Sequence, residues 1–538
     1  MTPTNPETYD VIIVGAGFAG LYGLHRLRGM GYSCRVLEAG DGIGGTWFWN
    51  RYPGAACDIE SVEYSYSFSE ELQDEWNWSC RFAPQPEILE YMNFVADKFD
   101  LRRDIQLETR VKSAHFDSAS GRWAVKTESD EEFSAKYVIM ATGCLSAPKD
   151  VEYPGLAEFE GEVYFTGKWP KDGVDFAGKA VAVIGTGSSA IQSVPIIAQE
   201  AESLTVFQRT PNFSVPAGNR SLDAGELDAL RDKYRELRKK ERNSNLGIDL
   251  ILDPEERAFA DVSEDEAIAE FERRWQAGGL YFYTSFTDLF VNGEANDALS
   301  EFARDKIRAK IDDPEVAELL VPKDHPFGAK RICSDTNYYE TFNRENVSLV
   351  DVRSDPITAM TATGIQTERV HHAFDVIVFA TGFDAMTGAL ARIDIRGRNG
   401  LSLKDKWEAG PRSYLGIMTS GFPNMFITTG PQSPSVLYNM VLGNEFHIEW
   451  ITDCIEHLRR EVLDTVEPSE TAEDSWVETV NEIGAMTLFP KANSWYLGAN
   501  VPGKPRVIMP YLGGFKAYKE TCKTVVSNGY DGFVFGEV

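Results

Sequence analysis

The segment 9–40 constrains the fold more than any other part of the chain. An apolar run at 11–14 precedes the spacing Gly-x-Gly-x-x-Gly, and a helical pattern and a second apolar run follow. Glycines at this spacing let backbone N–H groups approach a pyrophosphate, and an acid about 20 residues on can bind ribose hydroxyls. We therefore predict a dinucleotide-binding unit whose contacts are Gly15, Gly17, Gly20 and Glu38.

The same pattern recurs at 180–211, now with the spacing Gly-x-Gly-x-x-Ala. At the end of its second strand, Gln208, Arg209 and Thr210 stand where the first unit has its acid. A carboxylate would repel a 2′-phosphate, whereas a guanidinium and a hydroxyl bind one. This unit is therefore predicted to bind NADP(H), with further contacts from Gly185, Gly187, Ser188 and Ser189.

Two shorter segments indicate how the units are nested. Residues 137–143 and 375–382 each run a buried strand into Ala-Thr-Gly, an ending familiar from flavoproteins with two dinucleotide-binding domains. We expect an α/β fold in which a Rossmann-like NADP domain is inserted into a Rossmann-like FAD domain. The expected boundaries are 1–145 and 381–538 for the FAD domain with a C-terminal loop, 146–215 and 326–380 for the NADP domain, and 216–325 for a helical insertion.

Charge and cysteine usage narrow the functional classes. Acidic residues outnumber basic ones by 83 to 53, which argues against nucleic acid and anionic membranes as partners. The seven cysteines include no CxxC pair, so neither a metal site nor a redox dithiol is expected. Apolar runs stay below the roughly 18–20 residues of a membrane span, and the polar N-terminus does not look like a signal peptide. A cytoplasmic location is expected.

The missing cysteine pair also limits what a reduced flavin could do. Disulfide reductases pass electrons to a cysteine pair soon after the first glycine motif, and this chain has none there. Oxygen is the alternative acceptor. An oxygenase then needs a dry cavity and a cation that holds an anionic oxygen species.

Residues 159–170 resemble the fingerprint F-x-G-x-x-x-H-x-x-x-W-P/D of the Baeyer–Villiger monooxygenases, the type I enzymes of flavoprotein monooxygenase class B. Phe159, Gly161, Trp169 and Pro170 match, whereas Phe165 stands at the histidine position. Further stretches that resemble the family are 44–61, 327–340, 380–390 and 494–506, so the resemblance runs from about residue 8 to about residue 535.

The resemblance implies an FAD enzyme that uses NADPH and O2 to convert ketones to esters or lactones through a C4a-peroxyflavin, and that can also oxidise sulfides. It implies that Arg331 stabilises the peroxide anion and that Asp58 orients Arg331. Ala56 stands where the family pattern leads us to expect an arginine, which removes one charge near the flavin.

Other roles follow from the same resemblance. Lys330 would share the 2′-phosphate with Arg209 and Thr210, and the indole of Trp495 would hydrogen-bond NADP from a mobile loop. The implied flavin contacts also include Gly45, Thr46 and Trp47, and the implied wall of the ketone pocket includes Ser435, Val436 and Leu437.

Two alternatives stay open at this point. A heteroatom oxygenase for sulfides or amines would share every cofactor residue, and Trp169-Pro170 is the feature against it. A flavin-bearing redox sensor without productive turnover is the second, favoured slightly by Phe165 and Ala56. The expected partners are a small ketone and O2, and the expected state is a monomer or a weak homo-oligomer.

Overall fold

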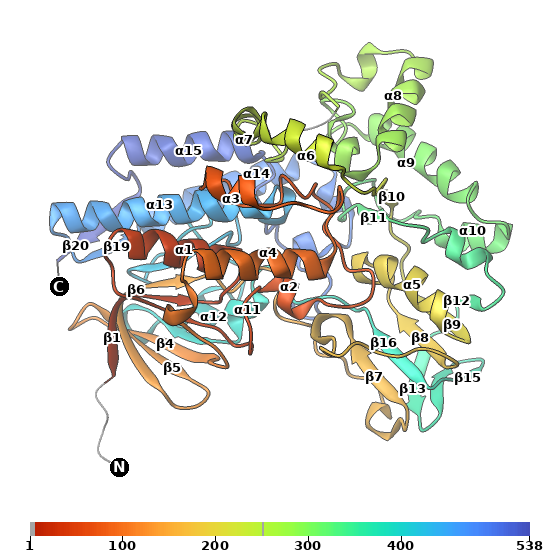
Figure 1. The fold of residues 1–538 in the computed structure, drawn as a ribbon, viewed down its shortest axis with the longest axis horizontal. Coiled ribbons are helices and arrows are strands. Elements are labelled where there is room, and N and C mark those ends of the chain that lie inside the picture. The colour runs from red at the N-terminus through yellow and green to blue at the C-terminus, as the bar shows by residue number, and fades with distance from the viewer. Residues whose placement is uncertain (1–5, 250–251, 538) are drawn as a thin grey trace.

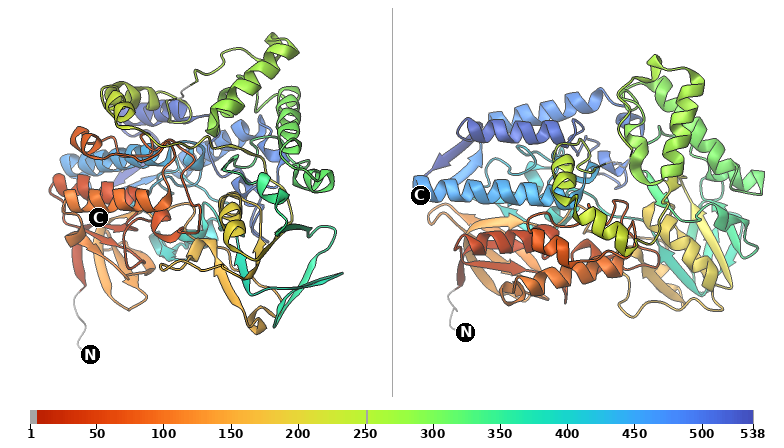
Figure 2. Two further views of the ribbon diagram at one scale, coloured as in Figure 1. Left: turned by 45° about the vertical axis from the view of Figure 1, so that its right-hand side comes forward. Right: turned by 45° about the horizontal axis from the view of Figure 1, so that its top comes forward.

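Two β-sheets lie at the two ends of the computed structural model, which describes residues 6–249 and 252–537 (Figures 1 and 2). The first sheet has the order β17-β4-β5-β6-β1-β2-β3, and β18 also pairs with β6. Its strands are β1 (Glu7–Val14), β2 (Cys34–Leu37), β3 (Ile105–Gln106), β4 (Val111–Asp117), β5 (Arg122–Thr127), β6 (Glu132–Met140), β17 (Asp394–Arg396) and β18 (Met425–Ile427).

The centre of the first sheet is parallel and buried. β1 pairs in parallel with both β2 and β6, so that Val11 lies between Cys34 and Tyr137. The apolar run predicted as a strand is the fully buried half of β1. Helix α1 (Phe18–Gly29) follows the glycine turn and packs against α13 (Met440–Glu461), a helix from the far end of the chain.

The second sheet is parallel throughout, with the order β12-β9-β8-β16-β7. Its strands are β7 (Glu162–Phe165), β8 (Ala180–Ile184), β9 (Ser203–Gln208), β12 (Val347–Asp351) and β16 (Val376–Phe379), and α5 (Ser188–Glu200) follows β8. Every strand of this sheet lies between β6 and β17 in the chain. The expected α/β fold, with one dinucleotide-binding unit inserted in another, is confirmed.

The chain crosses between the sheets at 144–149 and again at 382–386. The two crossings run antiparallel and bond to each other: Met386 N donates to Cys144 O at 2.8 Å, and Asp384 N donates to Ala147 O at 2.8 Å. The two covalent links of the inserted unit to the rest of the chain therefore run side by side as one double-stranded connection.

Five α-helices lie in the described residues of the segment 216–325: α6 (Ala224–Arg231), α7 (Tyr234–Glu241), α8 (Glu264–Ala277), α9 (Gly293–Arg308) and α10 (Pro314–Leu320). α7 packs on the first unit through the buried side chain of Arg238. This guanidinium donates to Val62 O at 2.7 Å and to Ser65 Oγ at 2.7 Å, and it pairs with Glu241 at 3.0 Å. We call these contacts the Arg238 anchor. Burial of a charge is tolerated here because the group is paired and hydrogen-bonded.

The remaining α-helices and small sheets cover these layers. The helices are α2 (Thr46–Trp49), α3 (Glu70–Glu75), α4 (Gln85–Lys98), α11 (Gly388–Ala391), α12 (Leu403–Lys406), α14 (Glu470–Ala485) and α15 (Phe515–Ser527). The small sheets are β10 (Ser214–Pro216) with β11 (Cys333–Asp335), β13 (Ile357–Thr361) with β14 (Gly364–Thr367) and β15 (His371–Ala373), and β19 (Thr465–Pro468) with β20 (Phe533–Gly536). Among the described helices, none is long and apolar enough to cross a membrane.

Candidate active site

The first glycine turn is shaped for close approach of a ligand. Gly15 has φ +107°, and a Cβ there would lie 2.5 Å from Ala141 O. Gly20 packs as tightly, since a Cβ would lie 1.9 Å from Gly15 O. Gly17 caps α1 without a side-chain hydrogen bond. A Cβ on Gly45 would lie 2.9 Å from the Cα of Gly17. The first amides of α1 therefore face a floor of glycine, which fits a dinucleotide pyrophosphate.

Glu38 lies buried at the end of β2 and fixes this turn. Its Oε2 accepts from Ala16 N at 2.7 Å, and its Oε1 accepts from Gly40 N at 2.8 Å. Burial raises the pKa of Glu38, and the backbone amides oppose that effect. An ionised carboxylate has about four lone-pair positions, so each oxygen keeps the capacity to accept from a ribose hydroxyl. Next to the turn, Thr46 is exposed, and buried Trp47 donates from Nε1 to Tyr64 Oη at 3.2 Å.

The second glycine turn repeats this design. Gly185 has φ +119°, and a Cβ there would lie 2.4 Å from Ala380 O. Gly187 caps α5 without a side-chain bond, and a Cβ on it would meet open space. Ser188 is exposed and Ser189 half-buried in the first turn of α5. A phosphate group can reach the amides at this end of α5.

Gln208, the last residue of β9, and the two residues that follow it have different surroundings. Gln208 is only 2% exposed and donates from Nε2 to Leu319 O at 2.7 Å, so it binds the end of α10. Arg209 is exposed and Thr210 half-buried. Burial lowers the pKa of Lys330; Asp324 opposes this, and nearby Arg353 and Arg209 lower the pKa further. The structure thus groups Arg209 and Lys330, as expected, and turns Gln208 toward the insertion.

Arg331 and Asp58 form a close ion pair between the two units. Asp58 Oδ2 accepts from Arg331 Nε at 2.9 Å and lies 2.6 Å from Nη2, while Arg331 Nη1 donates to Val436 O at 2.9 Å. The Arg331 side chain is 21% exposed and that of Asp58 is 25% exposed. Burial lowers the pKa of Arg331, but Asp58, Tyr496 and Tyr283 together outweigh burial and raise it. The guanidinium is therefore a fixed, permanent positive charge.

Two tyrosines lie beside Arg331 with hydroxyls that are not fully satisfied. The Oη atoms of Tyr283 and Tyr496 are buried without a well-formed hydrogen bond to the described residues; Tyr496 interacts with Arg331, and Tyr283 with the backbone of Ile332. Both tyrosines lie close enough to Arg331 to influence its pKa. Buried hydroxyls that are not fully satisfied, beside a guanidinium with unused N–H groups, fit a bound polar ring system such as a flavin or nicotinamide.

An apolar wall adjoins this polar group. Val436 and Leu437 belong to a cluster with Cys144, Met386 and Phe489. The third predicted wall residue behaves differently: Ser435 is fully buried and donates from Oγ to Thr429 O at 3.1 Å. Its hydroxyl therefore supports the turn, and the aliphatic side chains of its neighbours form the wall.

The C-terminal loop lies against the second crossing. Trp495 is half-buried with its ring 4.3 Å from that of Tyr496. Further along, Asn500 Nδ2 donates to Phe383 O at 2.8 Å, and Lys504 Nζ pairs with Asp384 at 2.5 Å. The loop that carries Trp495 is therefore tied to the connection between the two units.

The fingerprint stretch 159–170 contains β7, the edge strand of the second sheet, paired with β16. A Cβ on Gly161 would lie 2.4 Å from Asp375 O, so that no larger residue fits there. Phe165 stacks on Phe379 at 5.1 Å between ring centroids, which places a hydrophobic ring where the family motif has an imidazole. Trp169 is buried beside Tyr164, at 5.6 Å. The segment around Ala56, in the first unit, contacts α5, because Ala56 O accepts from Gln192 Nε2 at 3.0 Å.

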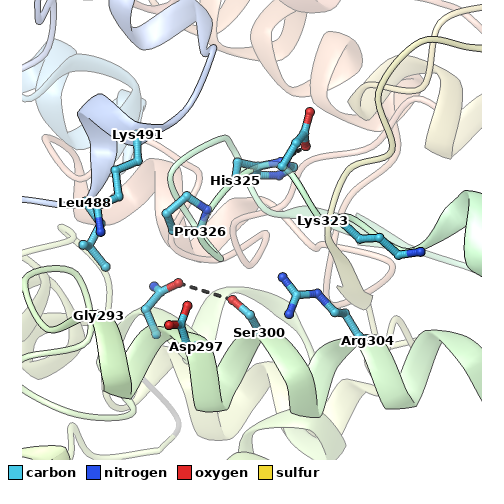
Figure 3. Close-up of a pocket in the computed structure, with 11 residues that line it drawn as sticks. Gly293, Asp297, Ser300, Arg304, Lys323, His325, Pro326, Leu488 and Lys491 are labelled. Atoms are coloured by element: carbon cyan, nitrogen blue, oxygen red, sulfur yellow. Dashed lines mark hydrogen bonds and ion pairs between the residues drawn. The ribbon is translucent and has the colours of Figure 1, made fainter. Parts of the chain in front are cut away.

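A separate polar cavity of about 270 Å³ lies between α9 and the loop 323–326 (Figure 3). Ser300 and Arg304 form one wall, Lys323 and His325 face them from the loop, and Lys491 lies at one end. Neither Arg331 nor Asp58 lines it. The cavity borders the NADP side of the site through Asp324, which also lines it.

Tyr283, Tyr496 and Arg353 lie at the candidate site but were not predicted from the sequence. Tyr496 directly follows Trp495, so its place in the matched stretch 494–506 was a usable signal. Tyr283 comes from the insertion, whose docking no local pattern reveals. Arg353 follows β12, and only the strand order brings it beside Thr210.

Comparison with known proteins gives concordant relatives. A family model for pyridine nucleotide-disulphide oxidoreductases matches residues 12–236. The acetone monooxygenase (methyl acetate-forming) of Gordonia sp. (strain TY-5) is 42% identical over 529 residues, 98% of this chain and 99% of that protein. A Baeyer-Villiger monooxygenase of Pseudooceanicola batsensis is 42% identical over 539 residues, 99% and 97% of the two chains. A solved structure, oxidized steroid monooxygenase bound to NADP, has a TM-score of 0.94 at 51% identity, covering 99% of this chain and all of the other. The sequence motifs also resemble those of phenylacetone monooxygenase, a resemblance that these matches do not test.

Proposed function

The chain belongs to the Baeyer–Villiger monooxygenases, and from that premise we propose that Arg331 and Asp58 carry its chemistry. It is an FAD enzyme that uses NADPH and O2 to convert a ketone to an ester or lactone, with NADP⁺ and water as the other products. The single observation that supports these roles is the Arg331–Asp58 pair, held beside two buried tyrosine hydroxyls that are not fully satisfied.

Bound FAD supplies hydride acceptance from NADPH and activation of O2. The contribution of Arg331 is a positive charge that needs no reorganisation when negative charge develops nearby. Its two hydrogen bonds and the Nη2–Asp58 ion pair engage three of the five guanidinium N–H groups, so one N–H on each Nη can still donate. These two donors would stabilise the oxygen atom that becomes negative as the ketone carbonyl is attacked.

Asp58 acts through Arg331. A carboxylate that accepts from both Nε and Nη2 fixes the plane of the guanidinium, since the two donors share one rigid fork. Val436 O holds Nη1 from the other side. This arrangement fixes the direction of the remaining N–H groups and keeps the charge from swinging into solvent, and those N–H groups would donate to the bound reactants.

The substrate side would be lined by Val436, Leu437 and Met386. An apolar wall beside a fixed cation excludes water, which strengthens the electrostatic interaction and favours an apolar ketone. Ser435 supports the wall from behind. On the cofactor side, Arg209, Thr210 and Lys330 would bind the 2′-phosphate of NADPH, and Trp495 would bind NADP through its indole N–H.

Other parts of the proposal concern organisation. We infer the domain boundaries given above, with the insertion 216–325 closing over the site from the NADP side, because the residues that pack around Arg331 come from both units and from the insertion. A cytoplasmic location and a monomer or weak homo-oligomer complete the proposal, supported by the acidic composition.

Oxygen labelling tests this function. FAD-loaded enzyme is incubated with NADPH, ¹⁸O2 and an equimolar mixture of an apolar ketone and a thioether, and the products are identified by mass spectrometry. We expect an ester or lactone that carries one ¹⁸O atom. A sulfoxide as the sole labelled product would favour the heteroatom oxygenase instead, and NADPH consumption that no substrate in a broad ketone panel stimulates would favour the redox sensor.

A further inference from the structure

Arg353 lies where the NADP end of the site is built, although no sequence motif points to it. β12 and β9 are parallel neighbours, and Asp351 of β12 is in register with Gln208 of β9. Arg353 and Arg209 therefore follow two adjacent strands at the same edge of the second sheet. The carboxyl edge of such a sheet is where ligands bind in open α/β folds.

The guanidinium of Arg353 is held by one of its nitrogens only. Its Nη2 donates to Thr210 Oγ1 at 2.8 Å and to Asp324 Oδ2 at 2.7 Å. Its Nε and Nη1 have no hydrogen-bond partner within 6–249 and 252–537. Both N–H groups of Nη1 and the N–H of Nε are thus left open, on different sides of the guanidinium, and each can donate a single charge-assisted hydrogen bond to a phosphate oxygen.

Asp324 is itself fixed from the other side. Its Oδ1 lies 2.7 Å from Nδ1 of buried His325, and His325 belongs to the loop that lines the cavity in Figure 3. Hydrogen bonding to His325 and then to Arg353 holds the pKa of Asp324 well below its ordinary value, although burial opposes this. The carboxylate therefore stays charged and keeps Arg353 in place at physiological pH.

The charges at this edge match a phosphate dianion. Arg209, Lys330 and Arg353 supply three positive charges, and Asp324 supplies one negative charge. The pKa of Lys330 is lowered by burial and, despite Asp324, by Arg353 and Arg209, so the three cations lie within electrostatic reach of one another. Such mutual repulsion is relieved when an anion of about two negative charges binds among them.

We propose that Arg353 is a further specificity-determining residue for NADPH, whose open Nη1 donates to the 2′-phosphate while Nη2 stays on Asp324 and Thr210. The proposal rests on the placement of that phosphate at Arg209, Thr210 and Lys330 in the proposed function. It adds a residue from another strand, and it explains why Thr210 presents its hydroxyl to a guanidinium.

Titration calorimetry of the FAD-loaded enzyme with NADP⁺ and with NAD⁺, without ketone, tests the proposal apart from turnover. In Arg353→Gln, the Kd for NADP⁺ should rise about tenfold, which is the loss of one charge-assisted contact at a half-exposed site. The Kd for NAD⁺ should change less than about twofold, since NAD⁺ lacks the phosphate. Arg353→Lys keeps the charge but loses the planar guanidinium that reaches Asp324, Thr210 and a phosphate at once, and it should raise the Kd for NADP⁺ by an intermediate factor of about three.

Arg344→Gln is the matched control, because Arg344 is an exposed arginine just before β12, at its opposite end, and contacts Asn346. The control should leave both constants unchanged. Equal weakening of NADP⁺ and NAD⁺ in Arg353→Gln would mean a structural role and overturn the proposal, as would an effect of Arg344→Gln equal to that of Arg353→Gln.

Arg209→Ala separates the two levels of inference. If it weakens NADP⁺ selectively while Arg353→Gln does not, the proposed phosphate site stands and the role of Arg353 is refuted. If neither variant changes the NADP⁺ to NAD⁺ ratio, the phosphate lies elsewhere and both proposals fall together.

Discussion

Replacement of Arg331 by alanine is the sharpest test of the proposed chemistry. The guanidinium has one unused N–H on each Nη after its bonds to Asp58 and Val436 are counted. A charge-assisted hydrogen bond contributes about 1.5–3 kcal/mol. If only one of these two N–H groups makes a hydrogen bond solely in the transition state, its removal costs about 3 kcal/mol at most, which is about 100-fold in rate. If both N–H groups do so, the rate falls further.

Two assays on the same preparation separate the steps. Anaerobic mixing with NADPH, followed by flavin absorbance, measures hydride transfer, which we expect to continue in Arg331→Ala. Under air, gas chromatography measures the ester, whose rate of formation we expect to fall by at least about tenfold while NADPH is still consumed. Removal of the cation alone would leave Asp58 without its partner. The double variant Arg331→Ala, Asp58→Ala therefore serves as the control for a stray negative charge.

The reasoning has a clear point of failure. Ester formation in Arg331→Ala above about one tenth of the wild-type rate would mean that less than ~1.4 kcal/mol of transition-state stabilisation came from the guanidinium. Full recovery in the double variant would assign the defect to unpaired Asp58 instead. Either result would remove Arg331 from the proposed chemistry.

Three further predictions concern other sites. Arg209→Ala should raise the KM for NADPH about tenfold or more and change that for NADH little, because one phosphate contact is lost; equal effects in steady-state kinetics would exclude contact with the 2′-phosphate. Burial raises the pKa of Glu63 well above its ordinary value of 4.5, and nearby Glu241 raises it further. The folded state therefore holds a proton that the unfolded chain releases, so the free energy of unfolding falls as the pH rises above 4.5. Glu63→Gln should therefore raise the melting temperature by about 2 °C at pH 8 and by less at pH 5, and a gain that is equal at both pH values would contradict this titration. Gly161→Ala forces a Cβ to 2.4 Å from a backbone oxygen and should destabilise the protein by about 1–3 kcal/mol, measured as a lower melting temperature. Gly29→Ala is the control and should not lower the melting temperature, because a Cβ there meets nothing within 4 Å. Similar melting of the two variants would show that the edge strand accommodates the methyl group.

Local patterns predicted the parts of the fold whose causes are local. Both glycine turns and their flanking strands lie where the apolar runs and spacings placed them, because a buried parallel strand and a tight turn each leave a signature within about 30 residues. The nesting of one unit in the other was also predictable, since residues 137–143 and 375–382 end in the same way.

The missed features depend on contacts between distant segments. β18 joins β6 from almost 300 positions away, and Arg353 reaches Thr210 only because β12 lies next to β9. The side chain of Gln208, at the end of β9, shows the same limit: its Nε2 donates to Leu319 O of α10, a contact with the insertion that no local pattern predicts. Periodicity gives the face of a strand and says nothing of which strand lies beside it.

The Arg238 anchor has a consequence for engineering. Transfer of 216–325 into a relative would carry Arg238 and its partner Glu241 into the hybrid but leave Val62 and Ser65 behind in this chain. A recipient without matching acceptors would then bury a guanidinium whose remaining N–H groups are unsatisfied, which typically costs about 1–3 kcal/mol for each unpaired group. Hybrids that transplant residues 61–73 together with the helices keep donor and acceptors from one parent. Their yield of folded, flavin-containing protein should exceed that of hybrids made from the helices alone.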